Sequence, residues 1–231
     1  AHNFAIDRQV AEQILKVYPQ GPQVAQANRA FLRRAVQWLV DQGIRQFLDI
    51  GSGIPTVGHV HEVAQATAPE SRVVYVDIDP IAVAHSRLIL KDNDRTAVIQ
   101  ADARQPEQIL NASELRLLDL DQPVAVLLIA LLHFIPDEDD PAGLIQRLTA
   151  PLVSGSYLAL SHATEDGAVD LDEGREIYKR SGIDLTFRSR EQLEAMFDSF
   201  SLVEPGLVFL PQWRPDTPDV VGDTPGSTPI Y

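Results

Sequence analysis

Short apolar runs and longer amphipathic stretches alternate along the chain from residue 46 onward. The apolar runs predict strands buried on both faces, and the stretches between them, with apolar positions at steps of three and four, predict helices. The predicted strands span 46–50, 72–77, 96–100, 124–132 and 155–161, and the predicted helices span 56–67, 80–91, 106–118, 141–152, 172–180 and 190–200, with an extended stretch at 201–210. This alternation predicts an α/β fold with a Rossmann-like, doubly wound, mostly parallel sheet.

Two further amphipathic stretches come before the first strand. Apolar side chains fall on one face of 5–18 and again of 24–39, so each stretch predicts a helix, and Pro19, Gly21 and Pro22 separate the two. After residue 210 the chain is rich in Pro, Asp, Thr and Gly, which predicts an irregular tail. We therefore expect one domain, with a helical segment at 1–45, a Rossmann-like core at 46–210 and an irregular tail at 211–231.

The composition is that of a globular protein. Hydrophobic residues make up 45% and charged residues 23% of the chain, which are ordinary values for a globular protein, and a length of 231 residues is ample for a buried core. No apolar stretch approaches the length of a membrane span, and no basic-then-apolar leader opens the sequence, so we expect a cytoplasmic protein. The absence of cysteine excludes disulfides, thiolate metal sites and a cysteine nucleophile.

The formal net charge of −14 bears on the choice of partners. An acidic surface repels phosphate backbones, and the densest basic spots, Arg33-Arg34 and Arg188 with Arg190, are small. We therefore expect a small-molecule partner and neither nucleic acid nor a membrane, while the sequence leaves the oligomeric state open.

The stretch "FLDIGSGIPT" at 47–56 places a glycine turn directly after the first predicted strand. A dinucleotide fingerprint requires a third glycine three residues after the second, but the next glycine here is Gly58, and Pro55 lies where backbone donors are wanted. By itself, the turn is compatible with a nucleotide site or with a turn made only for packing. Asp49 before Gly51 and Gly53 favours a ligand that carries an ammonium and a carboxylate over a pyrophosphate.

Acidic residues also end the second and third predicted strands. Asp77 follows the second strand, where a carboxylate can accept hydrogen bonds from both ribose hydroxyls. Asp79 is better placed to cap the helix that begins at Pro80. Asp102 follows the third strand, where a carboxylate and an adjacent backbone N–H can bind the amino edge of adenine.

Together these strand ends resemble class I S-adenosylmethionine-dependent methyltransferases. A more specific resemblance covers nearly the whole chain, to a bacterial family of S-adenosyl methyltransferases whose acceptor is unknown. The stretches that carry it are "ANRAFLRRAV", "IRQFLDIGSGIPT", "HEVAQ", "APESRVVYVDIDP" and "LLHFIPDEDDPAGL". The resemblance implies the fold and the cofactor, S-adenosyl-L-methionine, and leaves the acceptor unidentified.

The resemblance also implies roles for individual residues. The glycine turn would contact the amino-acid part of the cofactor, the second strand end the ribose and adenine, the third strand end the adenine edge, and the fourth strand end the methionine moiety. The N-terminal segment would fold over the cofactor side. The implied cofactor-binding residues are Asp49, Gly51, Ser52, Gly53, Asp77, Ile78, Asp102, Ala103, Ala130, Asn3 and Phe4.

Two histidines are the candidates for catalysis. His133 and His162 follow the fourth and fifth predicted strands, so both could reach an acceptor and serve as a general base. The alternative is that each hydrogen-bonds loop backbone. No metal site is expected, because His61 and Glu62 do not form the His-Glu-x-x-His spacing of a zinc motif.

Three functions follow from these observations. The first is a methyltransferase that acts on a small-molecule acceptor. The second is a protein that binds S-adenosylmethionine or S-adenosylhomocysteine without transfer, as a sensor or partner subunit. The third, a nucleotide-dependent oxidoreductase, is disfavoured by Asp49 and the displaced third glycine. A seventh strand is not evident, and "TPIY" at 228–231 is the candidate for its beginning, with the remainder outside this sequence.

Overall fold

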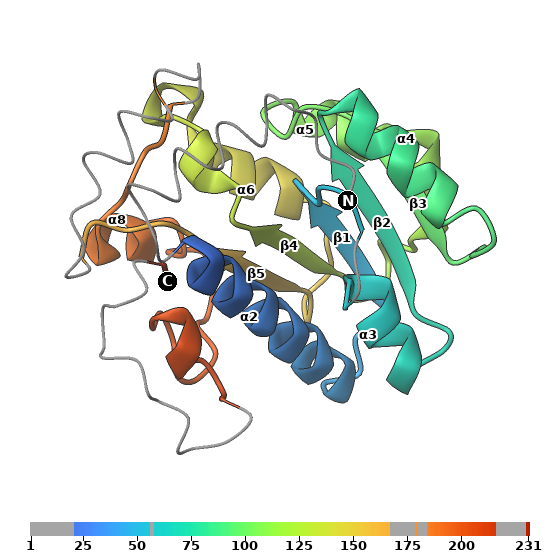
Figure 1. Ribbon diagram of the computed structural model, residues 1–231, viewed down its shortest axis with the longest axis horizontal. Coiled ribbons are helices and arrows are strands. Elements are labelled where there is room, and N and C mark those ends of the chain that lie inside the picture. Colours follow the sequence, from blue (N-terminus) through green and yellow to red (C-terminus); the bar gives the residue numbers. More distant parts are fainter. Residues whose placement is uncertain (1–20, 56–57, 167–178, 180–183, 216–229) are drawn as a thin grey trace.

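Five parallel strands form the centre of the molecule, in the spatial order β3-β2-β1-β4-β5 (Figure 1). The computed structural model describes residues 21–55, 58–166, 179, 184–215 and 230–231. All neighbouring strands run parallel, and Asp49 of β1 lies opposite Tyr75 of β2 and Leu127 of β4. The strands are β1 (Gln46–Ile50), β2 (Arg72–Asp77), β3 (Thr96–Gln100), β4 (Ala125–Ile129) and β5 (Tyr157–Ser161). The predicted α/β fold with a doubly wound parallel sheet is confirmed.

Helices cover both faces of the sheet, which is why the strands are apolar on both faces. One face packs against α2 (Gly21–Asp41), α3 (Val60–Thr67) and α4 (Pro80–Ile89). The other face packs against α5 (Pro106–Leu110), a 3₁₀ helix (Ser113–Leu117) and α6 (Pro141–Thr149). The helix α8 (Arg190–Ala195) contributes Leu193 to a small apolar cluster with Leu207 and Tyr231.

The order of the strands reverses at β1. The chain adds β2 and β3 on one side of β1 and then crosses over to add β4 and β5 on the other side. In such sheets ligands bind in the crevice beyond the carboxyl ends of the strands, where the order reverses. The carboxyl ends of β1, β2 and β4 therefore frame the region of interest.

Two predicted elements end or begin elsewhere because of single backbone positions. The strand predicted at 124–132 ends at Ile129, because Ala130 has a left-handed conformation (φ 54°) and a short 3₁₀ turn follows. The apolar pattern continues past this point because Leu132 is buried in the core. The helix predicted from residue 56 begins at Val60, after Gly58, whose φ is 86°.

Other predicted elements differ in extent or lie outside the described residues. The stretch 106–118 is two short helices, α8 ends at Ala195 instead of 200, and 201–210 is irregular before a 3₁₀ turn at Leu210–Gln212. The helices predicted at 5–18 and, apart from residue 179, at 172–180 lie outside the described residues, as does most of the tail. In the described part of the chain, every helix is too short or too polar to span a bilayer.

The last two residues pair with the chain just beyond β5. Ile230 forms an antiparallel bridge with Ala163, and the backbones of Tyr231 and His162 exchange hydrogen bonds of 2.9 and 3.0 Å. This antiparallel pairing lies where the sequence suggests that a further strand begins.

Candidate functional site

The glycine turn after β1 is tied to the end of β2. The backbone N–H groups of Gly51 and Ser52 donate to the carbonyl of Val76, at 2.8 and 3.1 Å. Gly51 and Gly53 have φ values of 74° and 63°, a conformation that L-residues with a side chain adopt at a cost. A Cβ on Gly51 would lie 2.7 Å from the side chain of Leu131, so the turn also needs glycine for close approach.

Asp77 at the end of β2 braces this turn. Its Oδ2 accepts a hydrogen bond from the N–H of Gly53 at 2.7 Å, and its Oδ1 accepts one from the N–H of Asp79 at 2.9 Å. Each carboxylate oxygen keeps a lone pair for a further donor, such as a ribose hydroxyl. Asp79 accepts from the N–H of Ile81 at 2.8 Å, which confirms it as the cap of α4. The neighbouring Ile78 is 57% exposed, as an apolar platform for a ring would be.

Asp49 lies buried at the end of β1, under the turn. The residue is 4% exposed, and among the described residues no donor hydrogen-bonds to its side chain. Burial, and then the nearby Asp77 carboxylate, raise the pKa of Asp49 to about 7. A buried carboxyl group without a donor is costly unless a cation or donor compensates it. The site therefore fits a ligand that brings an ammonium group to Asp49.

The end of β3 carries an ion pair that sequence reasoning missed. Asp102 accepts the backbone N–H of Arg104 and both Nε and Nη2 of its guanidinium, with the Nε distances at 3.0 and 2.9 Å. These hydrogen bonds from Arg104 lower the pKa of Asp102. An adenine amino group would share the carboxylate of Asp102 with Arg104. The next residue after Asp102, Ala103, is half-buried.

A polar chain connects α2 to the end of β4. The N–H of Ala130, in its left-handed conformation, donates to Ser161 Oγ at 2.9 Å, and Ser161 Oγ donates to Asn28 Oδ1 at 2.6 Å. Asn28 was not among the predicted residues. Its signal in the sequence is a polar amide next to the apolar positions of "ANRAF", and in the structure it is half-buried. The chain holds Ala130 and the following Leu131 beside Gly51.

His133 and His162 lie together beyond the ends of β4 and β5, with their ring centres 5.6 Å apart. Both are buried: His133 is 8% exposed and His162 is fully buried. Burial, with the charge of His162 and then of Arg188, lowers the pKa of His133 to about 3. Burial, and further the charge of Arg188, lowers the pKa of His162 to about 4. Both rings are therefore neutral at physiological pH.

Arg188 hydrogen-bonds to the Nε2 atom of His162. Its Nη1 donates to His162 Nε2 at 2.8 Å, so His162 carries its proton on Nδ1 and donates it to the carbonyl of Ala163 at 2.6 Å. The same guanidinium donates to the carbonyls of Leu132 and Ile135 at 2.9 and 2.8 Å. In this arrangement His162 has no ring nitrogen left for a substrate. Sequence reasoning missed the role of Arg188.

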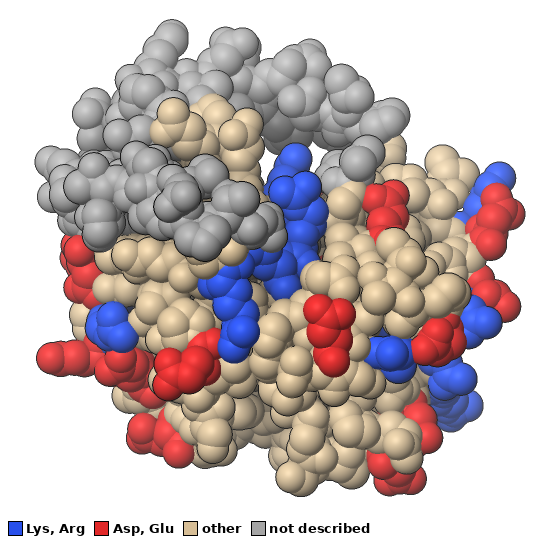
Figure 2. All heavy atoms as spheres, turned by 90° about the horizontal axis from the view of Figure 1, so that it is seen from below, with Lys and Arg blue, Asp and Glu red and all other residues tan. Residues whose placement is uncertain are grey.

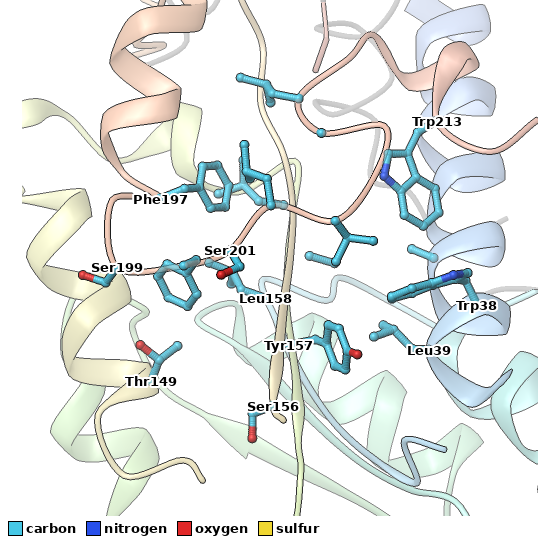
Figure 3. A pocket seen from close by; sticks show the side chains of 18 of the residues that line it. Trp38, Leu39, Thr149, Ser156, Tyr157, Leu158, Phe197, Ser199, Ser201 and Trp213 are labelled. Carbon is cyan, nitrogen blue, oxygen red and sulfur yellow. The ribbon is translucent and has the colours of Figure 1, made fainter. Parts of the chain in front are cut away.

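The described part of the chain contains a hollow of about 710 Å³ along the free edge of β5 (Figure 3). Trp38 and Leu39 of α2, Trp213 and Phe197 line it, together with Tyr157 and other residues of β5. None of the predicted cofactor-binding residues that the structure describes belongs to this lining. The hollow is therefore separate from the glycine turn.

Two of the predicted cofactor contacts come from the N-terminal segment. Asn3 and Phe4 lie outside the described residues, so their proposed contacts stay predictions. Among the described residues, no three His, Asp or Glu side chains are grouped closely enough to hold a metal ion.

The strand order, with its reversal at β1, is that of the Rossmann-like fold of class I methyltransferases. The chain belongs to the S-adenosyl methyltransferase family, whose model matches residues 1–231. This membership confirms the resemblance found in the sequence. A search among curated proteins gave no match.

Solved structures agree with this membership. A DUF574 family protein from Streptomyces avermitilis is 41% identical over 100% of this chain and 90% of its own, with a TM-score of 0.95. A "putative methyltransferase" from Thermobifida fusca is 38% identical over 99% of this chain and 86% of its own, with a TM-score of 0.91. The plantazolicin methyltransferase BamL, 13% identical over 83% of this chain and 66% of its own, shares the fold alone, with a TM-score of 0.50.

Proposed function

We propose that this protein transfers the methyl group of S-adenosylmethionine to a small-molecule acceptor. The observation that carries the proposal is the buried carboxyl group of Asp49, which has no hydrogen-bond donor among the described residues and lies beneath a glycine turn that Asp77 braces. The two carboxylates match the two ends of the cofactor, because an ammonium group pairs with the first and ribose hydroxyls donate to the second. Membership of the S-adenosyl methyltransferase family supports the same cofactor.

The residues of the chain would bind the cofactor and leave its reactive group intact. When bound, S-adenosylmethionine would supply a methyl group on a sulfonium: an acceptor lone pair bonds to the methyl carbon, the bond from carbon to sulfur breaks, and S-adenosylhomocysteine is the leaving group. The glycine turn lets the backbone approach the amino-acid part, and Ile78 offers an apolar surface to the adenine. Leu131, whose side chain packs against Gly51, would border the cofactor on the opposite side. Orientation of this kind can supply much of the rate enhancement.

The two histidines bear on the type of acceptor. Both ring nitrogens of His162 are hydrogen-bonded, so His133 is the better candidate for a base. The low pKa of His133, about 3, makes its neutral ring a weak proton acceptor. We therefore infer an acceptor whose nucleophile already carries a free lone pair at working pH.

The surface charge supports a small-molecule acceptor over nucleic acid. On the face shown in Figure 2, Lys and Arg side chains form one narrow group at the centre, and toward the edges they alternate with Asp and Glu. The chain carries 33 acidic and 19 basic residues. A duplex would meet net repulsion at the low ionic strength where its electrostatic binding is strongest.

A second candidate function, cofactor binding without transfer, is favoured by the hydrogen bonds that occupy both ring nitrogens of His162. One experiment separates the two functions. The protein is incubated with S-adenosylmethionine labelled in the methyl group and with an extract of the source cells, divided into low-molecular-mass and macromolecular fractions. Transfer to a small-molecule acceptor predicts label in the first fraction only. Cofactor binding with no label in either fraction would favour the second candidate.

A further inference from the structure

Two arginines stand on one side of α2 without a charged partner. Arg29 and Arg33 are four residues apart, so their side chains leave neighbouring turns of the helix. Both are exposed, and among the described residues neither makes an ion pair or a hydrogen bond. Like charges at this spacing destabilise a helix slightly.

Both arginines border the far end of the glycine loop. The Cδ atom of Arg33 lies 3.4 Å from the position that a Cβ on Gly58 would occupy, so its stem packs over that glycine. The charge of Arg29 is close enough to His59 to help lower the pKa of that histidine, after burial and the charge of His61. Gly58 and His59 come a few residues after the glycine turn that begins at Gly51.

The same turn of α2 lies at the carboxyl ends of the strands. Asn28, the residue before Arg29, accepts a hydrogen bond from Ser161 at the end of β5. The side chains of Arg29 and Arg33 therefore leave α2 near the carboxyl ends of the strands. Asp49 lies buried beneath this site, and the two arginines provide positive charge along its border.

An α-amino acid group has an ammonium and a carboxylate on one carbon atom. If the ammonium pairs with Asp49, the carboxylate is held within a few bonds of it and needs donors from another direction. Arginine is well suited to this task, because its planar fork matches a carboxylate and its long side chain can reach across a loop. We propose that Arg29 and Arg33 bind the carboxylate of the methionine half of the cofactor. This inference rests on the proposed function.

Calorimetric titration with two ligands tests the pair. The ligands are S-adenosylhomocysteine and its decarboxylated analogue, which keeps the adenosine, the thioether and the ammonium. The wild-type protein is expected to bind the carboxylated ligand about tenfold to a hundredfold more tightly, as charge-assisted hydrogen bonds do. In the double variant Arg29→Gln/Arg33→Gln this preference falls close to one, because S-adenosylhomocysteine binds more weakly and the analogue binds as before.

The variant Arg116→Gln is the matched control. Arg116 is also exposed and has no ionic partner among the described residues, and it lies on the 3₁₀ helix that packs against the opposite face of the sheet. Its substitution is expected to leave both affinities unchanged. A preference that persists in the double variant, or equal weakening of both ligands, overturns the inference while the proposed cofactor stands. A wild-type protein that binds neither ligand overturns the proposed cofactor and the inference together.

Discussion

Arg188 offers the sharpest test of how the loop after β4 is held. Its side chain is 1% exposed and donates to the carbonyls of Leu132 and Ile135 and to His162 Nε2. It also donates to the carboxylate of Asp137, at 3.0 and 2.7 Å. Replacing Arg188 with Met keeps most of the apolar stem and removes every donor. Three buried acceptors then lose a hydrogen bond at once.

The cost follows from the environment of each acceptor. A buried acceptor left without a donor costs about 1–3 kcal/mol, so two carbonyls and one imidazole nitrogen give at least about 3 kcal/mol. The side chain of Asp137 is 70% exposed, so water replaces the guanidinium there and the ion pair adds little. For a domain of this size, about 3 kcal/mol lowers the midpoint of thermal unfolding by about 10 °C.

Urea unfolding followed by circular dichroism measures the effect. Arg190→Met is the control, because Arg190 is half exposed and pairs with Glu194 one helical turn away, an interaction worth about 0.5 kcal/mol. Arg188→Lys keeps the charge and reaches fewer acceptors, so it is expected to fall between wild type and Arg188→Met. The reasoning is refuted if Arg188→Met loses less than about 1 kcal/mol, since the acceptors would then not depend on the guanidinium.

Two further predictions concern the glycine turn. Gly51→Ala places a methyl group against Leu131 at a position with a φ of 74°. The control is Gly43→Ala, at a position with a φ of 92° and open space around the new methyl group. Gly51→Ala should lower the free energy of unfolding by about 1–2 kcal/mol more than Gly43→Ala, and equal losses in urea unfolding would contradict the contact. Asp49 has a folded-state pKa of about 7 against an ordinary 3.8, so its contribution to stability is complete below pH 3.8 and is lost as pH rises through 7. Asp49→Asn should therefore gain stability over wild type between pH 5 and pH 8 in urea unfolding, and parallel pH profiles would contradict the raised pKa.

Much of the fold could be predicted from the sequence because its strands are buried on both faces. The strand β4, with the sequence AVLLI, is a continuous apolar run because four of its residues are buried and the fifth is half-buried. The pattern fails where apolar side chains continue into a loop. Leu132 is as buried as any residue of β4, so polarity gives no sign that Ala130 has already turned the chain.

The candidate site divides in the same way. Asp49 and Asp77 could be predicted as candidates from their positions, because Asp49 lies at the end of β1 just before the glycine turn and Asp77 is the last residue of β2. That Asp77 hydrogen-bonds Gly53 could not, since the two are 24 residues apart and only the pairing of β1 with β2 brings them together. The contacts of Arg188 with the loop after β4 span more than 50 residues, and nothing in "TFRSR" marks that arginine for burial.

Calorimetric titration with S-adenosylhomocysteine tests the proposed cofactor site most directly, with Asp77→Ala and Asp79→Ala measured beside the wild type. Both aspartates follow β2, but only Asp77 braces the glycine turn, whereas Asp79 caps α4. The account predicts micromolar binding by the wild type, about −8 kcal/mol, at least tenfold weaker binding by Asp77→Ala, and nearly unchanged binding by Asp79→Ala. No binding by the wild type, or equal binding by all three proteins, would contradict the site described above.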